Sequence, residues 1–339
     1  MSFQEKIQVL KDKEVLLTGG CGFIGSEVTK QLSEIGANVT IFDNLSSGKE
    51  SYISSFNNVN LIQGDIRDED AVASVVKNKE YIINLAALPF IPDSYQYPKE
   101  FFEVNVNGTM NVALSLLKQK EVKRFVHISS SEIYGTARQI PMNEDHPTTP
   151  HSTYAVSKLA GDRVVFTLHK EHDFPAVIIR PFNAFGPNIT QPYIIPEILT
   201  QLFNNNSEIK LGNIESKRDL TFVSDTARAM ILALVTDDIE GQTINVGSQK
   251  SVSVKELVTI MSKILSKSPS ITIDKSRLRP YDVNVLECDN TKAKNILNWS
   301  PEISVEDGLK ITIDWTIKNG IKFLDTFTGF KSPYRQSSK

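Results

Sequence analysis

A tyrosine and a lysine four residues apart, Tyr154 and Lys158, are the side chains in this sequence best suited to acid–base chemistry. On a helix, residues at this spacing lie on one face. The lysine ammonium is expected to lower the pKa of the phenol, which would let Tyr154 act as a base toward a hydroxyl group. The spacing also arises by chance. Tyr95 and Lys99 share it, but Pro98 lies between them and disfavours a common helix.

A glycine-rich stretch at residues 18–26 joins the apolar run 15–17 to a segment with helical periodicity. Its spacing is Gly19-x-x-Gly22-x-x-Gly25. Glycines allow a tight turn in which backbone N–H groups approach a pyrophosphate, and the start of the helix adds partial positive charge. We therefore expect a dinucleotide at this turn. The alternative is an ordinary strand-to-helix turn whose glycines serve close packing.

Carboxylates and small residues follow the next predicted strands. Asp43 ends the second strand, roughly 20 residues beyond the glycines, where a carboxylate accepts hydrogen bonds from the adenosine ribose and disfavours a 2′-phosphate. This position favours NAD over NADP. Asp65 ends a third strand and is a candidate for contact with the adenine amine. Ala86 and Ala87 follow a fourth strand, where larger side chains would obstruct a cofactor. For Asp43 the alternative is the start of a polar loop, and for the others it is helix capping or packing.

Strand and helix periods alternate along the first part of the chain. Because parallel strands need crossover connections, this alternation predicts a Rossmann-type α/β fold, a doubly wound parallel sheet with helices on both faces. We expect this domain to span residues 1–185. A smaller mixed α/β domain is expected at 186–339, with some strands and helices exchanged between the two. Strands are predicted at 15–17, 39–42, 60–63, 81–85, 124–128, 176–179, 209–211 and 243–246, and helices at 71–76, 98–120, 153–172, 194–203, 225–235, 254–265 and 305–317.

The composition is that of an ordinary globular protein, with 40% hydrophobic and 23% charged residues in a chain of 339. A net charge of -3 gives no reason to propose a nucleic-acid partner. Only Cys21 and Cys288 are present, so we expect neither a disulfide framework nor a Cys-rich metal site. Charged residues within 1–14 argue against a secretory segment there, and no apolar run approaches membrane-spanning length. We expect a cytosolic protein without a membrane partner.

Seven motifs in a fixed order resemble the extended short-chain dehydrogenase/reductase family, which includes nucleotide-sugar epimerases, dehydratases and decarboxylases. The likeness runs from about residue 13 to about residue 318. The motifs are the glycine stretch, Asp43, Gly64-Asp65-Ile66-Arg67-Asp68, Asn84-Leu85-Ala86-Ala87, Ser130-x-Glu132-x-Tyr134-Gly135, the Tyr154/Lys158 pair and Arg180-Pro181-Phe182-Asn183. In the second domain, the segments around Arg218 and Arg279 are similar to the family's diphosphate-binding arginines.

The resemblance implies a role for each matching residue. Tyr154 would be the base, Lys158 would hold the nicotinamide ribose, and Ser130 would hydrogen-bond the reacting hydroxyl. Asn105 would lie near the catalytic lysine. Substrate contacts are implied for Ser131, Asn183, Arg218 and Arg279, although a surface salt bridge is the alternative for either arginine. NAD contacts are implied for Gly19, Gly22, Phe23, Ile24, Gly25, Asp43, Asn44, Ser47, Gly48, Asp65, Ile66, Leu85, Ala86, Ala87, Asn105, Tyr154, Lys158 and Pro181.

Glu132 separates the reactions that the resemblance allows. All of them would begin with Tyr154 removing the proton of the sugar 4-hydroxyl while hydride passes to NAD, giving a 4-keto sugar. Glu132 could then remove the acidified hydrogen on carbon 5, with loss of the 6-hydroxyl as water. The family's 4,6-dehydratases carry this glutamate and typical 4-epimerases lack it, but sugar-uronate decarboxylases also resemble this motif.

Ser131 departs from one branch of the family, because thymidine-linked glucose dehydratases have Asp at its place. The acid that assists water loss would then be Ser131 with a water molecule, or another group. GDP-mannose dehydratases resemble this chain in having Ser there.

A longer local match, at residues 85–95 and 131–137, is similar to the retaining UDP-N-acetylglucosamine 4,6-dehydratases. Alternatively, these loops only shape the nicotinamide side of the pocket. We therefore predict an NAD-dependent 4,6-dehydratase of a UDP-hexosamine. The resemblance also implies a homodimer that pairs through the helix near 100–120 and the Tyr154 helix. The alternatives are a UDP-sugar 4-epimerase, a UDP-glucuronate decarboxylase, and a non-catalytic NAD-binding scaffold or sensor.

Overall fold

The predicted alternation of strands and helices forms a seven-stranded sheet of strand order β10-β6-β5-β4-β1-β2-β3, which confirms the Rossmann-type α/β fold class. All of its pairings are parallel. The strands are β1 (Glu14–Thr18), β2 (Asn38–Asp43), β3 (Val59–Gln63), β4 (Tyr81–Asn84), β5 (Arg124–Ile128), β6 (Ala176–Pro181) and β10 (Thr243–Val246). The chain order reverses between β1 and β4, and ligands of open α/β sheets bind at the carboxyl ends of the strands beside such a point.

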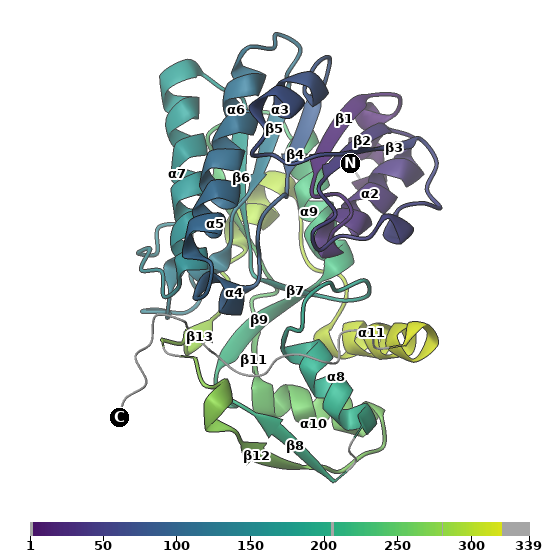
Figure 1. Ribbon diagram of the computed structural model, residues 1–339, viewed down its shortest axis with the longest axis vertical. Helices are drawn as coiled ribbons and strands as arrows, with labels where there is room; N and C mark the ends of the chain where they lie inside the picture. The colour runs from purple at the N-terminus through teal and green to yellow at the C-terminus, as the bar shows by residue number, and fades with distance from the viewer. Residues whose placement is uncertain (1–2, 205–206, 280, 321–339) are drawn as a thin grey trace.

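A computed structural model describes residues 3–204, 207–279 and 281–320. These residues form an upper lobe around the parallel sheet and a smaller lower lobe, with β7 and β9 between them (Figure 1). Among the residues described, no helix has both the length and the apolar character needed to cross a bilayer.

Successive side chains of the central strands point to opposite faces of the sheet, as the period of two requires. Leu17 belongs to a buried cluster with residues of α2 (Phe23–Ile35) and α9 (Val223–Val235), whereas Leu16 belongs to a cluster on the other face. The second face is covered by α3 (Glu69–Val75), α6 (Thr109–Leu117) and α7 (Thr153–His172). α1 (Phe3–Ile7) packs against α9. Strands buried on both faces are typical of parallel sheets.

The helix predicted at 98–120 is continuous in course but irregular in the middle. It consists of α5 (Pro98–Phe102), a π-helical segment at Glu103–Gly108, and α6, which ends three residues earlier than expected. The π segment contains the buried Asn105, whose side chain bonds to the loop after β4. Such segments often occur at functional sites.

The lower lobe contains a small sheet in which β9 (Lys217–Phe222) pairs with β7 (Asn183–Phe185), β11 (Ser251–Ser253) and β13 (Val285–Leu286). A second sheet pairs β8 (Glu208–Leu211) with β12 (Ser270–Ile273). The lobe's apolar cluster is formed with α8 (Ile194–Asn204), α10 (Val254–Ile264) and α11 (Val305–Asn319).

Three elements that follow residue 185 pack in the upper lobe: β10, α9 and the π-helical η6 (Ala293–Leu297), which contacts both of the others. β10 pairs with β6, and α9 covers one face of the sheet against α2. The remaining short helical elements are η1 (Gln8–Leu10), η2 (Glu50–Tyr52), α4 (Ile91–Ser94), η4 (Ser131–Tyr134) and η5 (Lys275–Arg277).

Candidate active site

A cavity of about 340 Å³ opens where both lobes meet the carboxyl ends of the central strands. All eight predicted catalytic and substrate-binding residues line it: Ser130, Ser131, Glu132, Tyr154, Lys158, Asn183, Arg218 and Arg279. Tyr154 and Lys158 are also predicted cofactor contacts, and five further predicted cofactor residues line the cavity, namely Phe23, Ile24, Leu85, Ala87 and Pro181. The fold thus brings residues that are up to 256 positions apart in the sequence to one site.

The glycine turn leaves room for a pyrophosphate at the start of α2. Gly19 has a φ of +71°, and a Cβ atom there would lie 2.8 Å from the backbone nitrogen of Ala86. A Cβ on Gly25 would lie only 2.1 Å from the Gly19 carbonyl oxygen. Gly22 caps α2 without a side chain that could bond to the free N–H groups of its first turn. These groups fit a bound phosphate, so the turn suits the expected NAD.

The carboxylate of Asp43 is held at the end of β2 beside the glycine turn. Its Oδ2 accepts the Cys21 N–H at 2.9 Å, and its Oδ1 accepts the Leu45 N–H at 2.8 Å. Each carboxylate oxygen has a second lone pair. Asp43 can therefore still accept hydrogen bonds from a ribose. The loop that carries Ser47 closes onto the same turn, because a Cβ at Gly48 would lie 2.8 Å from Cys21 atoms.

Asp65 and Asn44 meet at the neighbouring strand ends, where the Asn44 amide donates to Asp65 Oδ2 at 2.9 Å. Arg67 also bonds to Asp65, and this contact holds the pKa of the Asp65 carboxyl well below its usual range. The side chain of Ile66 is buried and packs against Gly108. These residues do not line the 340 Å³ cavity but extend the line of strand ends beyond it. An elongated dinucleotide would follow such a line.

Ser130 connects the expected base to the turn that carries Glu132. Its side chain hydrogen-bonds to the Tyr154 hydroxyl. The same Oγ accepts the Glu132 N–H at 3.2 Å, which caps η4. Tyr154 lies in the first turn of α7, whose start is fixed by the Ser152 cap on the Ala155 N–H. Hydrogen bonds between side chains and nearby backbone N–H groups thus position Ser130, Glu132 and Tyr154.

The expected lowering of the tyrosine pKa is wrong for this structure. Burial raises the pKa of Tyr154 to about 12, and the Ser130 hydrogen bond opposes this while the Glu132 charge adds to it. Burial also lowers the pKa of Lys158 to about 8, against the opposing effect of the Asp162 carboxylate. The Lys158 ammonium donates to the Ile128 carbonyl at 2.5 Å. The expectation was based on the spacing of the two residues on a helix, but the effect of burial on each pKa is larger than the effect of the neighbouring charge.

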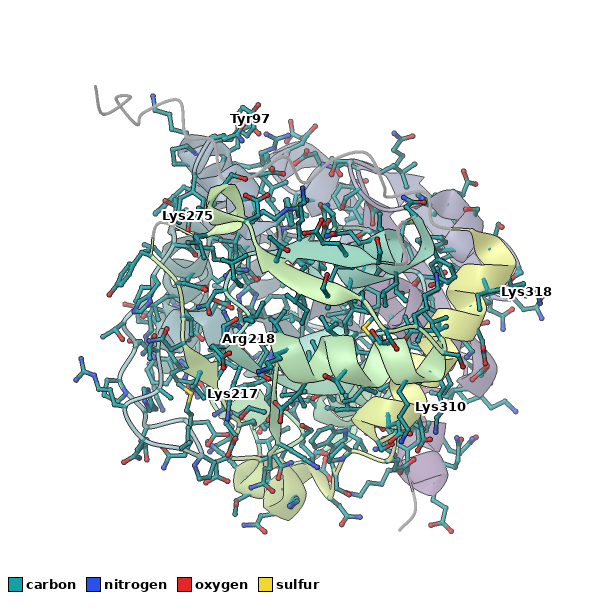
Figure 2. All side chains as sticks on the ribbon, turned by 90° about the horizontal axis from the view of Figure 1, so that it is seen from below. Tyr97, Lys217, Arg218, Lys275, Lys310 and Lys318 are labelled. Atoms are coloured by element: carbon teal, nitrogen blue, oxygen red, sulfur yellow. The ribbon has the colours of Figure 1, made fainter. Side chains whose placement is uncertain are left out.

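Glu132 lies beside Arg218, with 3.8 Å between the Glu132 Oε1 and the Arg218 Nε. Arg218 also donates to the Val283 carbonyl at 2.8 Å and lies 3.4 Å from Asp282 Oδ1. Asp282 also pairs with Arg279, with 3.6 Å between Asp282 Oδ1 and Arg279 Nη1. In Figure 2 Arg218 lies well inside the outline of the molecule, whereas Lys318 lies at its edge. The Arg218 side chain is only 12% exposed. The ion pairs of Arg218 are therefore not surface salt bridges, the alternative considered for this arginine.

A buried network that the sequence analysis did not assign holds α7 and η4 together. Arg180 forms a two-pronged ion pair with Asp162, one turn beyond Lys158, with distances of 2.9 and 3.2 Å. It also donates to the Tyr134 hydroxyl at 2.8 Å, and Tyr134 donates to Asn245 at 2.8 Å. Tyr134 and Arg180 fell within the recognised motifs, but no spacing rule indicated that they would meet.

Asn105 stays outside the cavity lining, although it was expected among the cofactor contacts. Its Oδ1 accepts the Leu88 N–H at 2.8 Å, and its Nδ2 donates to the Leu88 carbonyl and to Ser157 Oγ. It therefore ties the loop after β4 to the helix that carries Lys158. Further cavity residues to which the sequence analysis gave no individual role include Asp282, Phe90 and Tyr193. They lie in irregular loops, for which we had no pattern to interpret.

Both cysteines are buried, and burial raises the pKa of each thiol, that of Cys21 to about 12. Tyr95 and Lys99 do not share a helix, because Tyr95 follows the end of α4 and Lys99 belongs to α5. Neither the thiols nor this second tyrosine–lysine pair forms an alternative catalytic arrangement within the described ranges.

Comparison with known proteins places the chain among nucleotide-sugar enzymes. A family model described as GDP-mannose 4,6 dehydratase matches residues 16–312. A putative UDP-glucose 4-epimerase from Methanocaldococcus jannaschii is 30% identical over 90% of this chain and 99% of its own length.

Solved structures with the same architecture include both epimerases and a dehydratase. Epimerase Mth375 from Methanothermobacter thermautotrophicus has a TM-score of 0.88 at 31% identity and covers 94% of this chain and 96% of its own. UDP-N-acetylglucosamine 4-epimerase from Methanobrevibacter ruminantium M1, in complex with UDP-N-acetylmuramic acid, has a TM-score of 0.83 at 30% identity, covering 91% and 99%. The dTDP-glucose 4,6-dehydratase DesIV from Streptomyces venezuelae, with NAD bound, has a TM-score of 0.82 at 27% identity, covering 90% and 97%.

Proposed function

The chain belongs to the extended short-chain dehydrogenase/reductase family of nucleotide-sugar dehydratases and epimerases, and we propose that it is an NAD-dependent 4,6-dehydratase of a UDP-hexosamine such as UDP-N-acetylglucosamine. The observation that carries this proposal is the Glu132 carboxylate in the cavity, close enough to Tyr154 for its charge to raise the pKa of the phenol. A carboxylate there opposes ionisation of the base. We infer that the reaction uses this carboxylate.

The chain's own residues supply the acid–base steps. Tyr154 takes the proton of the sugar 4-hydroxyl, and Ser130, already bonded to the phenol, orients that hydroxyl. Lys158 holds its charge beside the end of β5 through the Ile128 carbonyl. NAD, when bound, supplies the hydride acceptor, and the glycine turn, Asp43 and Lys158 are the groups that would hold it.

Glu132 performs the step that distinguishes a dehydratase. A ketone at carbon 4 acidifies the hydrogen on carbon 5, and the Glu132 carboxylate removes that proton while the 6-hydroxyl departs. Its backbone N–H is fixed by Ser130, and its Oε1 lies 3.8 Å from Arg218. The ion pair with the Arg218 guanidinium helps to fix the position of this carboxylate in the cavity.

Arg218 and Arg279 would bind the substrate diphosphate at the lower-lobe side of the cavity. Both line it, and both face Asp282. Guanidinium groups suit two-pronged contacts with phosphate oxygens. Asn183, also in the lining, has a buried Oδ1 without a hydrogen-bond partner among the described residues, so its amide remains available to a ligand.

Mass spectrometry of the product tests the proposal. Purified protein incubated with NAD and UDP-N-acetylglucosamine is expected to give a product lighter by one water. A set of UDP-hexosamines that all emerge with unchanged mass and inverted carbon 4 would exclude the dehydratase, and release of carbon dioxide from UDP-glucuronate would indicate a decarboxylase. Activity that survives undiminished in Tyr154→Phe would refute the catalytic assignment itself.

A UDP-sugar 4-epimerase is the second candidate, and one contact favours it. The 3.8 Å ion pair with Arg218 can hold the Glu132 carboxylate away from carbon 5, in which case the keto sugar would turn over and regain its hydrogen at carbon 4. Several relatives are described as epimerases, including the two archaeal structures reported above. The product mass separates the two candidates.

The proposed enzyme is a homodimer that pairs through α5, α6 and α7. These helices pack against one another at one side of the upper lobe (Figure 1). Each leaves a large apolar side chain exposed, namely Phe102 (38%), Leu114 (41%) and Val156 (40%). Light scattering after size-exclusion chromatography is expected to give twice the chain mass, and Leu114→Glu is expected to shift it toward the monomer. A wild-type monomer at micromolar concentration would contradict this pairing.

A further inference from the structure

Tyr193 brings a second phenol to the cavity, from the opposite lobe to the Ser130–Glu132 turn. It directly precedes α8 and lines the cavity. Its ring meets the edge of Phe90, which follows β4 of the upper lobe, with 5.8 Å between centroids and an interplanar angle of 67°. This contact spans the two lobes and holds the ring of Tyr193 against the cavity wall.

The Tyr193 hydroxyl is free to bond a ligand. Within the described residues it has no hydrogen-bond partner, although its backbone N–H bonds to Gln191. Burial raises the pKa of Tyr193, with a further increase from the charge of Tyr154 and a partial decrease from Arg279. The phenol is therefore protonated at neutral pH. Electrostatic coupling to both groups also places it within range of the base and of an arginine assigned to the diphosphate.

A sugar bound between Tyr154 and the diphosphate arginines would therefore lie beside Tyr193. Loss of the 6-hydroxyl needs a proton donor on that sugar, because hydroxide is a poor leaving group. Ser131 is an aliphatic alcohol and a much weaker acid than a phenol, whose pKa is ordinarily about 10. The arginines Arg218 and Arg279 remain charged and do not give up protons at neutral pH. Tyr193 is the phenol that the lower lobe contributes to the cavity, and it carries its proton at neutral pH.

We propose that Tyr193 is the acid that protonates the departing 6-hydroxyl, an inference that rests on the proposed dehydratase function. In this step Glu132 takes the proton of carbon 5, and the electron pair of that C–H bond forms the double bond between carbons 5 and 6. The bond between carbon 6 and oxygen breaks as the oxygen takes the Tyr193 proton, so that one water leaves. The resulting phenolate regains a proton from solvent.

Tyr193→Phe tests this role, because it removes the hydroxyl and keeps the ring that meets Phe90. The variant is incubated with NAD and UDP-N-acetylglucosamine in D₂O, and both the dehydrated product and the deuterium at carbon 5 of recovered substrate are measured. We expect water loss to fall by about 10²- to 10⁴-fold, the usual range for a general acid, while exchange at carbon 5 continues. Continued exchange also shows that the variant is folded and that Glu132 still acts.

A matched control and a substrate analogue complete the experiment. Tyr281→Phe removes a hydroxyl from a tyrosine that is 60% exposed and stacked on His151 outside the cavity lining, so it should lose water at the wild-type rate. A UDP-hexosamine with fluorine in place of the 6-hydroxyl needs no acid to release fluoride, so Tyr193→Phe should process it at close to the wild-type rate.

The outcomes separate this inference from the proposed function. If Tyr193→Phe loses water as fast as the wild-type protein does, the role of Tyr193 alone is overturned. The same follows if Tyr193→Phe processes the fluorinated substrate much more slowly than the wild-type protein does. A wild-type protein that causes no water loss and no exchange at carbon 5 with any UDP-hexosamine would overturn both.

Discussion

Lys158 is held in the fold at a cost to stability, so Lys158→Met should give a more stable but inactive protein. Burial lowers the pKa of Lys158 from 10.5 to about 8. At about 1.36 kcal/mol per pKa unit, the charged group costs roughly 3 kcal/mol. Methionine has a similar length and no charge, but it loses the hydrogen bond to the Ile128 carbonyl, worth about 1 kcal/mol. We expect the variant to gain about 2 kcal/mol in its free energy of unfolding at pH 7.

The pH dependence of this gain identifies its cause. Below pH 8 the lysine is charged in the folded and unfolded chains, so the folded wild-type protein bears the full cost. Between pH 8 and 10.5 the folded protein has released the proton and the unfolded chain still binds it, so wild-type stability rises with pH relative to the variant. Near pH 10.5 the charge no longer contributes, and Lys158→Met should be less stable by about 1 kcal/mol.

Urea denaturation of both proteins between pH 7 and 10.5 measures this difference. Lys170→Met is the matched control, since Lys170 lies on the same helix and is exposed, and it should change stability by less than about 0.5 kcal/mol at any pH. A Lys158→Met protein that is no more stable than wild type at pH 7 would refute the reasoning. So would a stability difference that stays constant over this pH range.

Two further substitutions test the supports of the site. Gly25→Ala places a Cβ 2.1 Å from the Gly19 carbonyl oxygen, so the turn must shift and calorimetric NAD affinity should fall at least tenfold; unchanged affinity would contradict the close approach. Tyr134→Phe removes the hydroxyl between Arg180 and Asn245, and the loss of these two buried hydrogen bonds should lower the free energy of unfolding in urea by about 1–3 kcal/mol. A Tyr134→Phe protein as stable as wild type would mean that Arg180 finds another partner.

The fold could be predicted in some detail because its signals are local. The sequence places a helix at 153–172, and α7 spans Thr153–His172, with the Ser152 side chain capping its first turn. The expected strands of the first domain likewise appear with their ends within two residues of the predicted positions. The helix at 98–120 was less well predicted, because its π segment follows from bonds between Asn105 and distant groups at Leu88 and Ser157.

The cavity could be predicted as a set of residues but not as an electrostatic environment. Motif order identified Ser130, Glu132, Tyr154 and Lys158, and all four line one cavity. The pKa of Tyr154 was predicted in the wrong direction, because spacing on a helix contains no information about burial. Tyr193 and Asp282 were missed for a related reason: irregular loops carry them, and only the packing of the two lobes shows what they face.

The central claim is that Glu132 acts after the ketone has formed, and Glu132→Gln tests it most directly. Glutamine keeps the size of the side chain and the backbone N–H bond to Ser130, but it cannot accept the proton of carbon 5. With NAD and UDP-N-acetylglucosamine in D₂O, we expect the variant to accumulate NADH and a 4-keto sugar that has not lost water. This sugar should carry no deuterium at carbon 5. Normal release of water by Glu132→Gln would contradict the account and leave Glu132 with a structural role beside Arg218.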